Sequence, residues 1–297
     1  MTGNIFITGA GGFLGRALVR RFRETGEGAR VFSGDWIDVR EPGDELRDLF
    51  TAHGVQAVVH LAAHVEIKLE AGVDGWPEPG RVDVGKLYAT NVTGTANVMD
   101  SCVRAGVRHL IFASSQTVYG MPGGTLTEDS PLKPLEHYAA SKAAAENVLR
   151  MGAEQRLNVT VLRIPGVYSE GRKRGAVWTM CRDAVRDGVV RVSPNIRLPM
   201  NIIHRQDVVD ALIRVIEERP AGLQTYNVST PDPCSLAILA EDIAAMVEGC
   251  KIEWSGPRQP VVEMDPRRIE NALGWKARPR VERLRAMVES MGDETES

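Results

Sequence analysis

A glycine-rich turn directly behind a short apolar run most constrains how this chain can fold. Residues 4–8, NIFIT, are apolar and β-branched and predict a buried strand. An amphipathic pattern then predicts a helix, and a strand, glycine turn and helix together form a phosphate-binding unit of dinucleotide folds. Glycine lets the backbone turn tightly and approach a pyrophosphate. A structural turn without a ligand is the alternative. The glycines are Gly9, Gly12 and Gly15, in the spacing GxxGxxG.

Strands and helices alternate along the chain, which predicts a parallel sheet covered by helices on both faces. The expected strands are 4–8, 30–33, 56–60, 108–114, 159–164 and 224–229. The expected helices are 13–25, 43–53, 88–105, 138–155, 206–218, 234–248 and 266–274. The segment 69–86, which is rich in glycine and proline, predicts a loop or lid.

We therefore predict an α/β chain with a Rossmann-like doubly wound parallel sheet and a smaller C-terminal substrate lobe. The dinucleotide-binding domain would comprise 1–165 and about 204–229, and the substrate-binding lobe about 166–203 and 230–290. Residues 291–297 are expected to be a frayed tail. Ligands lie at the carboxyl ends of strands in such sheets, which would gather Gly9, Ala62, Ser115 and Pro165 around one crevice.

The overall charge and composition exclude several partners. The chain has 297 residues, 43% of them hydrophobic, and a net charge of −3 without a basic block, so nucleic acid and anionic membranes are not favoured partners. No apolar run reaches the length of a membrane span, and no signal peptide precedes the first strand, so we expect a cytoplasmic protein. Four scattered cysteines and six histidines show no metal-binding spacing, so reduced thiols and no metal site are expected.

Tyr138 and Lys142 stand four residues apart in EHYAASKAAAE and would share one face of a helix. A nearby ammonium group favours the phenolate and lowers the pKa of a tyrosine, so that it can exchange a proton with an alcohol or a ketone. The alternative is a surface helix that carries both residues by chance.

With these motifs the chain resembles the extended short-chain dehydrogenase/reductases, and most of all the NAD-dependent epimerase/dehydratase family. TGAGGFLG is similar to the family's cofactor turn, HLAA to the strand end beside the cofactor, and NVTGT to its NxxGT helix. FASSQTVYG is similar to the strand with the catalytic hydroxyl, and RIPGVY to the nicotinamide contact. NIIHRQDVVDAL, YNVST and DPRRIENALGW are similar to later landmarks.

The resemblance implies roles for individual residues. Ser115 would hold the substrate oxygen, Tyr138 would be the acid/base, and Lys142 would hold the nicotinamide ribose and lower the pKa of Tyr138. Ser114 is an alternative to Ser115, and Asn91 has the alternative of tying a helix to a strand. The expected cofactor-binding residues are Gly9, Gly12, Phe13, Leu14, Gly15, Asp35, Asp38, Val39, Leu61, Ala62, Ala63, Asn91, Tyr138, Lys142, Pro165 and Val167.

An acidic residue about 20 positions beyond the glycines is expected to bind the adenosine ribose. Asp35 and Asp38 both qualify, with Asp35 favouring NAD and Asp38 lying at the ribose or the adenine. No arginine directly follows the second strand, where a 2′-phosphate would need one, although Arg16 and Arg40 are not far away. NAD is therefore the expected cofactor, with NADP as the alternative.

The resemblance also bears on the reaction. Dehydratases of the family carry an Asp-Glu pair where this chain has Gln116 and Thr117, so we predict no dehydratase activity. A sugar epimerase that works by transient hydride transfer is favoured. A ketoreductase of a nucleotide ketosugar or of a small non-sugar ketone, and a non-catalytic cofactor sensor, are the alternatives.

The expected substrate is a nucleotide sugar. The expected substrate contacts are Gln116, Arg172 and Arg258. The two arginines are expected there because a guanidinium group suits a diphosphate. Met200 occupies a position where nucleotide-sugar enzymes often have arginine, which leaves room for a substrate without a nucleotide. By resemblance, helices 88–105 and 138–155 would form a four-helix interface in a homodimer.

Overall fold

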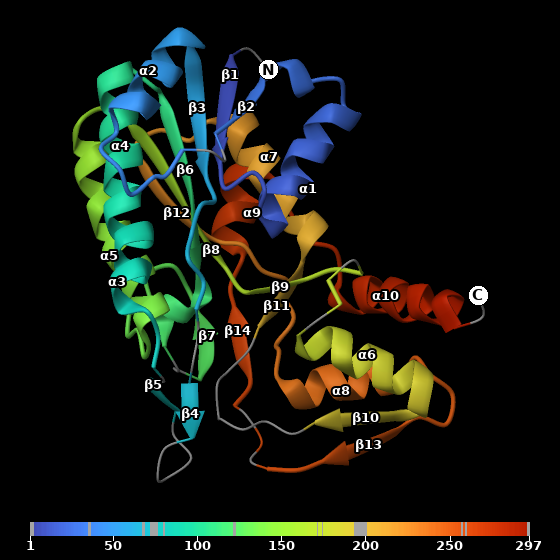
Figure 1. Ribbon diagram of the computed structural model, residues 1–297. Coiled ribbons are helices and arrows are strands. Elements are labelled where there is room, and N and C mark those ends of the chain that lie inside the picture. The colour runs from blue at the N-terminus through green and yellow to red at the C-terminus, as the bar shows by residue number, and fades with distance from the viewer. Residues whose placement is uncertain are drawn as a thin grey trace.

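The computed structural model contains one six-stranded parallel sheet with a smaller layer beside it (Figure 1). It describes residues 3–34, 37–66, 69–71, 77–79, 81–120, 123–170, 172–173, 175–192, 201–256, 258 and 260–295. The large sheet has the order β12-β8-β6-β3-β1-β2. Its strands are β1 (Asn4–Thr8), β2 (Val31–Ser33), β3 (Val55–His60), β6 (His109–Ser115), β8 (Asn158–Ile164) and β12 (Leu223–Asn227).

The strand order changes direction beside β1. The chain pairs β2 on one side of β1 and then returns to pair β3 on the other side. Ligands in doubly wound sheets lie outside the carboxyl ends of the strands at such a switch point. Here the residues that follow β1 and β3 are Gly9 and Leu61, so the predicted crevice opens where the glycine turn meets the HLAA segment.

Each face of the sheet has its own hydrophobic core, because side chains alternate along every strand. Ile5, Ile7 and Ile111 point toward α1 and α7, whereas Phe6 and Phe112 point toward α4 and α5. The first face is covered by α1 (Phe13–Glu24), α7 (Arg205–Glu218) and α9 (Arg267–Leu273), and the second by α2 (Asp44–Ala52), α4 (Gly94–Ala105) and α5 (His137–Glu154) (Figure 1).

A third core lies in the smaller layer. Met180, Leu239 and Met287 belong to one buried cluster that joins three helices. This layer comprises α6 (Ala176–Asp187), α8 (Leu236–Ala244) and α10 (Arg280–Thr295) with the parallel pair β10 (Val189–Val192) and β13 (Lys251–Trp254). Two further parallel pairs connect it with the sheet: β9 (Gly166–Tyr168) with β11 (Ile202–His204), and β7 (Gly124–Leu126) with β14 (Val262–Met264).

The predicted α/β fold and parallel sheet are confirmed, and four local expectations differ. The predicted loop 69–86 contains an antiparallel pair, β4 (Leu69–Ala71) with β5 (Pro77–Pro79), and the start of α3 (Val84–Tyr88). The predicted helix 88–105 is interrupted by a π-helical turn, Ala89–Thr93. Most of the predicted tail is helical, because α10 continues to Thr295 and Met291 packs against the third core. The helix expected at 266–274 packs on the large sheet beside α7.

Candidate active site

The glycine turn forms one wall of a cavity of about 330 Å³ at the carboxyl ends of β1, β2 and β3. Gly9 has a φ of +67°, and a Cβ atom there would lie 2.6 Å from the backbone nitrogen of Ala62. A Cβ on Gly15 would lie 2.3 Å from the carbonyl oxygen of Gly9. Glycine is therefore required at both positions, so that turn, helix and HLAA segment can pack closely. The cavity is lined by Thr8, Gly9, Gly34, Ile37, Asp38, Val39 and Ala62.

These contacts fit an extended dinucleotide at this edge of the sheet. Gly12 is the N-cap of α1 and has no side-chain capping bond, so the first N–H groups of the helix face outward, toward where an anion would lie. Thr8, Gly34 and Ile37 were missed by the sequence reasoning. Sequence reasoning could not place the residues after β2 beside the glycine turn, because that arrangement depends on the order of the strands in the sheet.

Asp38 lies in the cavity wall and is held by Arg40. The guanidinium Nε of Arg40 donates to both carboxylate oxygens of Asp38, at 2.8 and 2.9 Å. These hydrogen bonds from Arg40 lower the pKa of Asp38 to about 2, so its carboxylate is ionised at neutral pH. Asp35, the other predicted ribose contact, lies outside the described residues.

Arg172 lies on the cofactor side of the predicted crevice. Its guanidinium is 4.9 Å from the centre of the Phe13 ring, and its Nη1 donates to the carbonyl oxygen of Val167 at 2.8 Å. Arg205 lies 4.8 Å from the same ring. Phe13 and Val167 are both predicted cofactor residues, so the structure places Arg172 among them, although it was predicted as a substrate contact.

Asn91 joins the HLAA segment to the helix that carries Tyr138. Its side-chain oxygen accepts from the backbone N–H of His64 at 2.8 Å, and its Nδ2 donates to the carbonyl oxygen of His64 and to Ser141 Oγ, both at 2.9 Å. Ser141 in turn donates to the carbonyl oxygen of Tyr138 at 2.7 Å. The π-helical turn that contains Asn91 is an arrangement often found at functional sites.

His60 and Thr95 continue this connection toward the cavity. His60 Nδ1 lies 2.6 Å from Thr8 Oγ1, and its Nε2 lies 3.1 Å from Thr95 Oγ1. The Thr95 hydroxyl donates to the carbonyl oxygen of Asn91, so the His60 Nε2 is the donor of its pair. Burial lowers the pKa of His60 to about 3, which keeps the ring neutral. With both ring nitrogens bonded and the ring neutral, His60 is a structural histidine within this connection.

Ser115 ends β6 at the edge of the crevice. Its Oγ accepts from the backbone N–H of Thr117 at 3.2 Å and from the Thr117 hydroxyl at 3.0 Å. A serine oxygen has one proton of its own, so two accepted bonds leave that proton available for donation. Ser114 points elsewhere, because its Oγ donates to Glu146 Oε1 at 2.5 Å.

Tyr138 lies in the first turn of α5 and is 9% exposed. Glu136 caps this helix by accepting from the backbone N–H groups of Tyr138 and Ala139, each at 2.6 Å. Burial, together with the nearby Glu136 carboxylate, raises the pKa of Tyr138 to about 12, while a hydrogen bond with Ser115 acts in the opposite direction. The expected lowering of this pKa by Lys142 is therefore not seen in the structure.

The reason lies in the environment of Lys142, which is 3% exposed. Its Nζ sits 4.2 Å from the centre of the Phe112 ring. Burial lowers the pKa of Lys142 to about 7, with Glu146 acting in the opposite direction. A lysine that holds its proton weakly at neutral pH cannot favour the phenolate strongly.

The remaining substrate predictions lie around and beyond Ser115. Gln116 begins the 3₁₀ turn after β6, and its buried Oε1 has no hydrogen-bond partner within the described parts of the chain. Arg258 lies beyond β13, with its guanidinium 5.4 Å from the centre of the ring of Trp254, a partly buried residue at the end of that strand. The structure thus brings Gln116 to the predicted crevice, whereas Arg258 belongs to the smaller layer.

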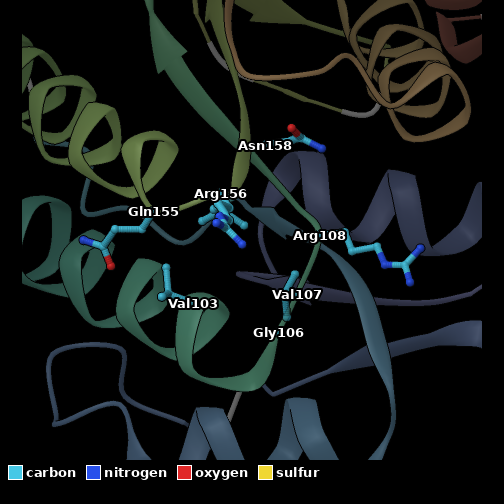
Figure 2. Close-up of a pocket in the computed structure, with 8 residues that line it drawn as sticks. Val103, Gly106, Val107, Arg108, Gln155, Arg156 and Asn158 are labelled. Carbon is cyan, nitrogen blue, oxygen red and sulfur yellow. The ribbon is translucent and has the colours of Figure 1, made fainter.

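A second cavity, of about 280 Å³, lies at the opposite end of the sheet and contains none of the predicted site residues. It is bounded by the amino ends of β6 and β8 and the carboxyl ends of α4 and α5. Figure 2 shows the side chain of Arg108 extending away from Val103 and Gln155. Its lining residues are Val103, Gly106, Val107, Arg108, Gln155, Arg156, Leu157 and Asn158.

Comparison with known proteins identifies the family of the chain. The model of the NAD-dependent epimerase/dehydratase family matches residues 5–229. The chain belongs to this family. The resemblance noted in the sequence is thereby confirmed, and the chain is an NAD(P)-dependent enzyme of the extended short-chain dehydrogenase/reductase type.

Individual relatives of this family member differ in their substrates. Human (Homo sapiens) 3 beta-hydroxysteroid dehydrogenase type 7 is 33% identical over 208 residues, which are 62% of this chain and 53% of that protein. The chain thus matches about half the length of this relative. UDP-glucose 4-epimerase of Bacillus subtilis is 26% identical over 299 residues, covering 90% of this chain and 83% of that protein.

A solved structure resembles the whole chain. MoeE5 in complex with UDP-glucuronic acid and NAD superposes with a TM-score of 0.78 at 26% identity, covering 99% of this chain and 100% of that one. The family membership and this likeness confirm the predicted Rossmann-like fold and the predicted use of NAD or NADP. Among the described helices, none is both long and apolar enough to cross a membrane.

Proposed function

We propose that this enzyme is a nucleotide-sugar epimerase that works by transient hydride transfer, with Tyr138 as the acid/base. The observation that carries the proposal is that Ser115 at the end of β6 is hydrogen-bonded to Tyr138, while Lys142, one turn further along α5, packs on Phe112 of the same strand. Similarity to a UDP-glucose 4-epimerase over 90% of this chain, and to an NAD-bound structure that also holds UDP-glucuronic acid, supports the class of reaction and of substrate.

The residues divide the chemistry among them. NAD, when bound, would accept a hydride from a sugar carbon and return it to the other face. Ser115 donates its available proton to the substrate oxygen and stabilises charge there. Tyr138 takes the hydroxyl proton as the carbon is oxidised and returns it on reduction. Ser114 has no part in this step, because its hydroxyl is bonded to Glu146.

Lys142 would hold the nicotinamide ribose through its ammonium group. Hydrogen-bond acceptors on a ribose favour the charged form of a lysine, which would counteract the effect of burial on its pKa. A charged Lys142 would then favour the phenolate of Tyr138. The acid/base system that the sequence predicted would thus include the bound substrate and cofactor as well as Tyr138 and Lys142.

We propose NAD in preference to NADP. The two arginines that the sequence analysis considered for a 2′-phosphate are already bonded: Arg40 to Asp38, and Arg16 through Nη1 to the carbonyl oxygen of Gly11 at 2.7 Å. An ionised Asp38 in the cavity wall also repels a phosphate and accepts hydrogen bonds from ribose hydroxyls. Arg172 and Arg205, beside Phe13, would then neutralise the pyrophosphate.

We assign Gln116 and Arg258 to the substrate. The buried Oε1 of Gln116 would accept a hydrogen bond from a sugar hydroxyl, which would satisfy a group that is costly to leave unpaired. Neither Gln116 nor Thr117 is a carboxylic acid, so we also propose that the enzyme does not eliminate water from its substrate.

We also propose a homodimer through α4 and α5. Val98 and Ala139 are fully buried within the subunit and cannot contact a second copy, so the interface would consist of other residues of these helices. On α5, Ala144 and Val148 are partly exposed and Met151 is 48% exposed. A second copy would cover this apolar face. Light scattering at micromolar concentration tests this, and a monomer would contradict it.

The deciding experiment combines cofactor analysis with a substrate panel. Mass spectrometry of the denatured protein is expected to find retained NAD, because an epimerase regenerates its cofactor in each cycle. Proton NMR of UDP- and dTDP-hexoses incubated with the enzyme is expected to show an epimer without net oxidation. Tyr138→Phe should slow this conversion by roughly 10³-fold. The matched variant Tyr226→Phe, at a residue of the sheet core, should not.

A dehydrogenase acting on an alcohol without a nucleotide is the second candidate, because the human steroid dehydrogenase is 33% identical to the matched part of this chain. It would consume free cofactor in proportion to product. Steady production of NADH from NAD and a hydroxysteroid, with no conversion of any nucleotide sugar, would establish this alternative.

A further inference from the structure

Glu146 stands one helical turn beyond Lys142 on α5, and it is held by donors from two strands. Ser114 Oγ of β6 donates to its Oε1 at 2.5 Å. Arg163 of β8 donates from Nε to Oε1 at 3.2 Å and from Nη2 to Oε2 at 2.7 Å. Both side chains of this ion pair are less than a tenth exposed. The carboxylate therefore has a fixed position, one helical turn along α5 from Lys142.

The guanidinium of Arg163 is fixed on its far side as well. Its Nη1 donates to the Tyr119 hydroxyl at 3.0 Å and to the carbonyl oxygen of Glu128 at 2.9 Å. Tyr119 then donates to Asn227 Oδ1 on β12 at 2.6 Å. This network spans three neighbouring strands, so the Glu146 carboxylate cannot follow Lys142 if the lysine moves.

Lys142 and Glu146 are both buried residues of α5. Positions i and i+4 share a face of a helix, so the two side chains of α5 are neighbours. Burial disfavours the ammonium, whereas Glu146 favours it. Other titratable groups around the site are Tyr138 and Glu136 at the start of α5, His60 on β3, and Arg163, which is paired with Glu146. His60 is neutral, and its low pKa is caused in part by Lys142.

We propose that Glu146 is a positioning residue that keeps the Lys142 ammonium charged and directed at the nicotinamide ribose. Its effect on the reaction passes through Lys142 to Tyr138, and this inference rests on the proposed function. Arg163 and Ser114 hold the carboxylate in place through the hydrogen bonds described above. The chemistry thus depends on a third charged residue that contacts neither the substrate nor the cofactor.

A purely structural ion pair is the competing explanation, and a double variant separates the two. In Glu146→Gln/Arg163→Met both buried charges are removed together, which is often neutral or stabilising for the fold. A structural role predicts that this variant behaves like the wild type. A positioning role predicts that the pKa of Lys142 falls in the double variant as it does in Glu146→Gln, because both variants remove the carboxylate that favours the ammonium.

The experiment is a pH titration of the full chain by NMR with ¹³Cε-labelled lysine, with the Lys142 signal assigned from Lys142→Met. We expect a wild-type midpoint near neutral pH. In Glu146→Gln and in the double variant it should move down by about one pH unit or more, a tenfold loss of proton affinity. Circular dichroism confirms that each variant is folded. If the single variant does not fold, the double variant decides.

An unchanged midpoint in the folded double variant overturns the proposal. Arg163→Met alone provides a test in the opposite direction, because it leaves Glu146 unneutralised and should raise the Lys142 midpoint. The titration needs no substrate, so its outcome is independent of whether a nucleotide sugar is converted. Failure of the Tyr138→Phe experiment would thus be distinguishable from failure of this one.

Discussion

Thr117 donates its hydroxyl proton to Ser115 Oγ at 3.0 Å, two residues along the turn that follows β6. With the backbone N–H of Thr117 at 3.2 Å, it supplies both hydrogen bonds that Ser115 accepts here. The position matters because the dehydratases that the sequence resembles use a carboxylate there. A threonine cannot perform that acid/base step, but by donating to Ser115 it leaves the serine its own proton to donate, to Tyr138 or to a substrate oxygen.

Thr117→Val should therefore slow hydride transfer while preserving the fold. The variant keeps the shape of the side chain and the backbone donor, but it frees one acceptor site on Ser115, so the serine proton is held less firmly. We expect roughly a tenfold decrease in kcat, with NAD content unchanged. Substrate-dependent absorbance of bound NADH at 340 nm measures the step. The exposed Thr125→Val is the control, and equal rates in both variants would remove Thr117 from the mechanism.

The fold was largely predictable, because its signals are local and repeated. The apolar, β-branched run NIFIT and the glycines behind it are sufficient for β1, the turn and α1, and β3 and β6 contain similar apolar runs. The π-helical turn at Asn91 was not predictable. It depends on hydrogen bonds to His64, 27 residues earlier, and to Ser141, 50 residues later, which no local pattern encodes.

The candidate site divides in the same way. Tyr138 and Lys142 were predicted from motif spacing and Ser115 from the family resemblance, but the electrostatics around them were not predicted. The pKa of Lys142 depends on how completely Phe112 and the sheet bury it, and on a carboxylate whose partners lie on β6 and β8. The sequence reasoning therefore expected Lys142 to act strongly on Tyr138, whereas the structure makes burial the larger effect on both groups.

Gly9→Ala should abolish retention of the cofactor. The added methyl group would lie 2.6 Å from the Ala62 nitrogen, and a φ of +67° is unfavourable for alanine. The turn and the HLAA segment would separate, and the cavity wall would be displaced. We expect NAD to be absent from the purified variant by mass spectrometry. Gly123→Ala is the control, since no atom lies within 4 Å of a Cβ there. NAD at wild-type occupancy in Gly9→Ala would contradict the assigned cavity.

Two buried histidines should make the protein less stable in mild acid. Burial lowers the pKa of His60 to about 3 and that of His109 to about 4, whereas both titrate near 6.5 when unfolded. Between these values the unfolded chain binds more protons, so stability rises with pH and is lost as pH falls below 6.5. At pH 5 each histidine should cost roughly 2 kcal/mol relative to neutral pH.

Urea unfolding at pH 7 and pH 5 measures this loss. His109→Gln should remove about half of it, because glutamine does not titrate and can still bond to Thr160, which lies 2.8 Å from His109 Nε2. His53→Gln, at the partly buried end of α2, is the comparison and should leave the loss intact. An identical pH dependence in wild type and His109→Gln would show that His109 is protonated in the folded protein.

Lys142→Met should make the protein more stable and inactive. The pKa of Lys142 is lowered from 10.5 to about 7 on folding, so the folded state disfavours the ammonium. Below pH 7 the wild type carries a buried cation, and this cost decreases as pH rises from 7 to 10.5 because the folded protein then binds fewer protons than the unfolded chain. Methionine fills a similar volume without charge. We expect a gain of roughly 2 to 4 kcal/mol at pH 6 that becomes small near pH 10.

The exposed Lys251→Met serves as the control, because a solvated ammonium on β13 has no such cost. Thermal unfolding at pH 6 and pH 10 measures both variants. A gain at pH 6 together with loss of hydride transfer would mean that the enzyme gives up stability to keep a cation beside Tyr138. A variant less stable than the wild type at pH 6 would mean that the Lys142 ammonium stabilises the fold, through Glu146 and the Phe112 ring, more than burial opposes it.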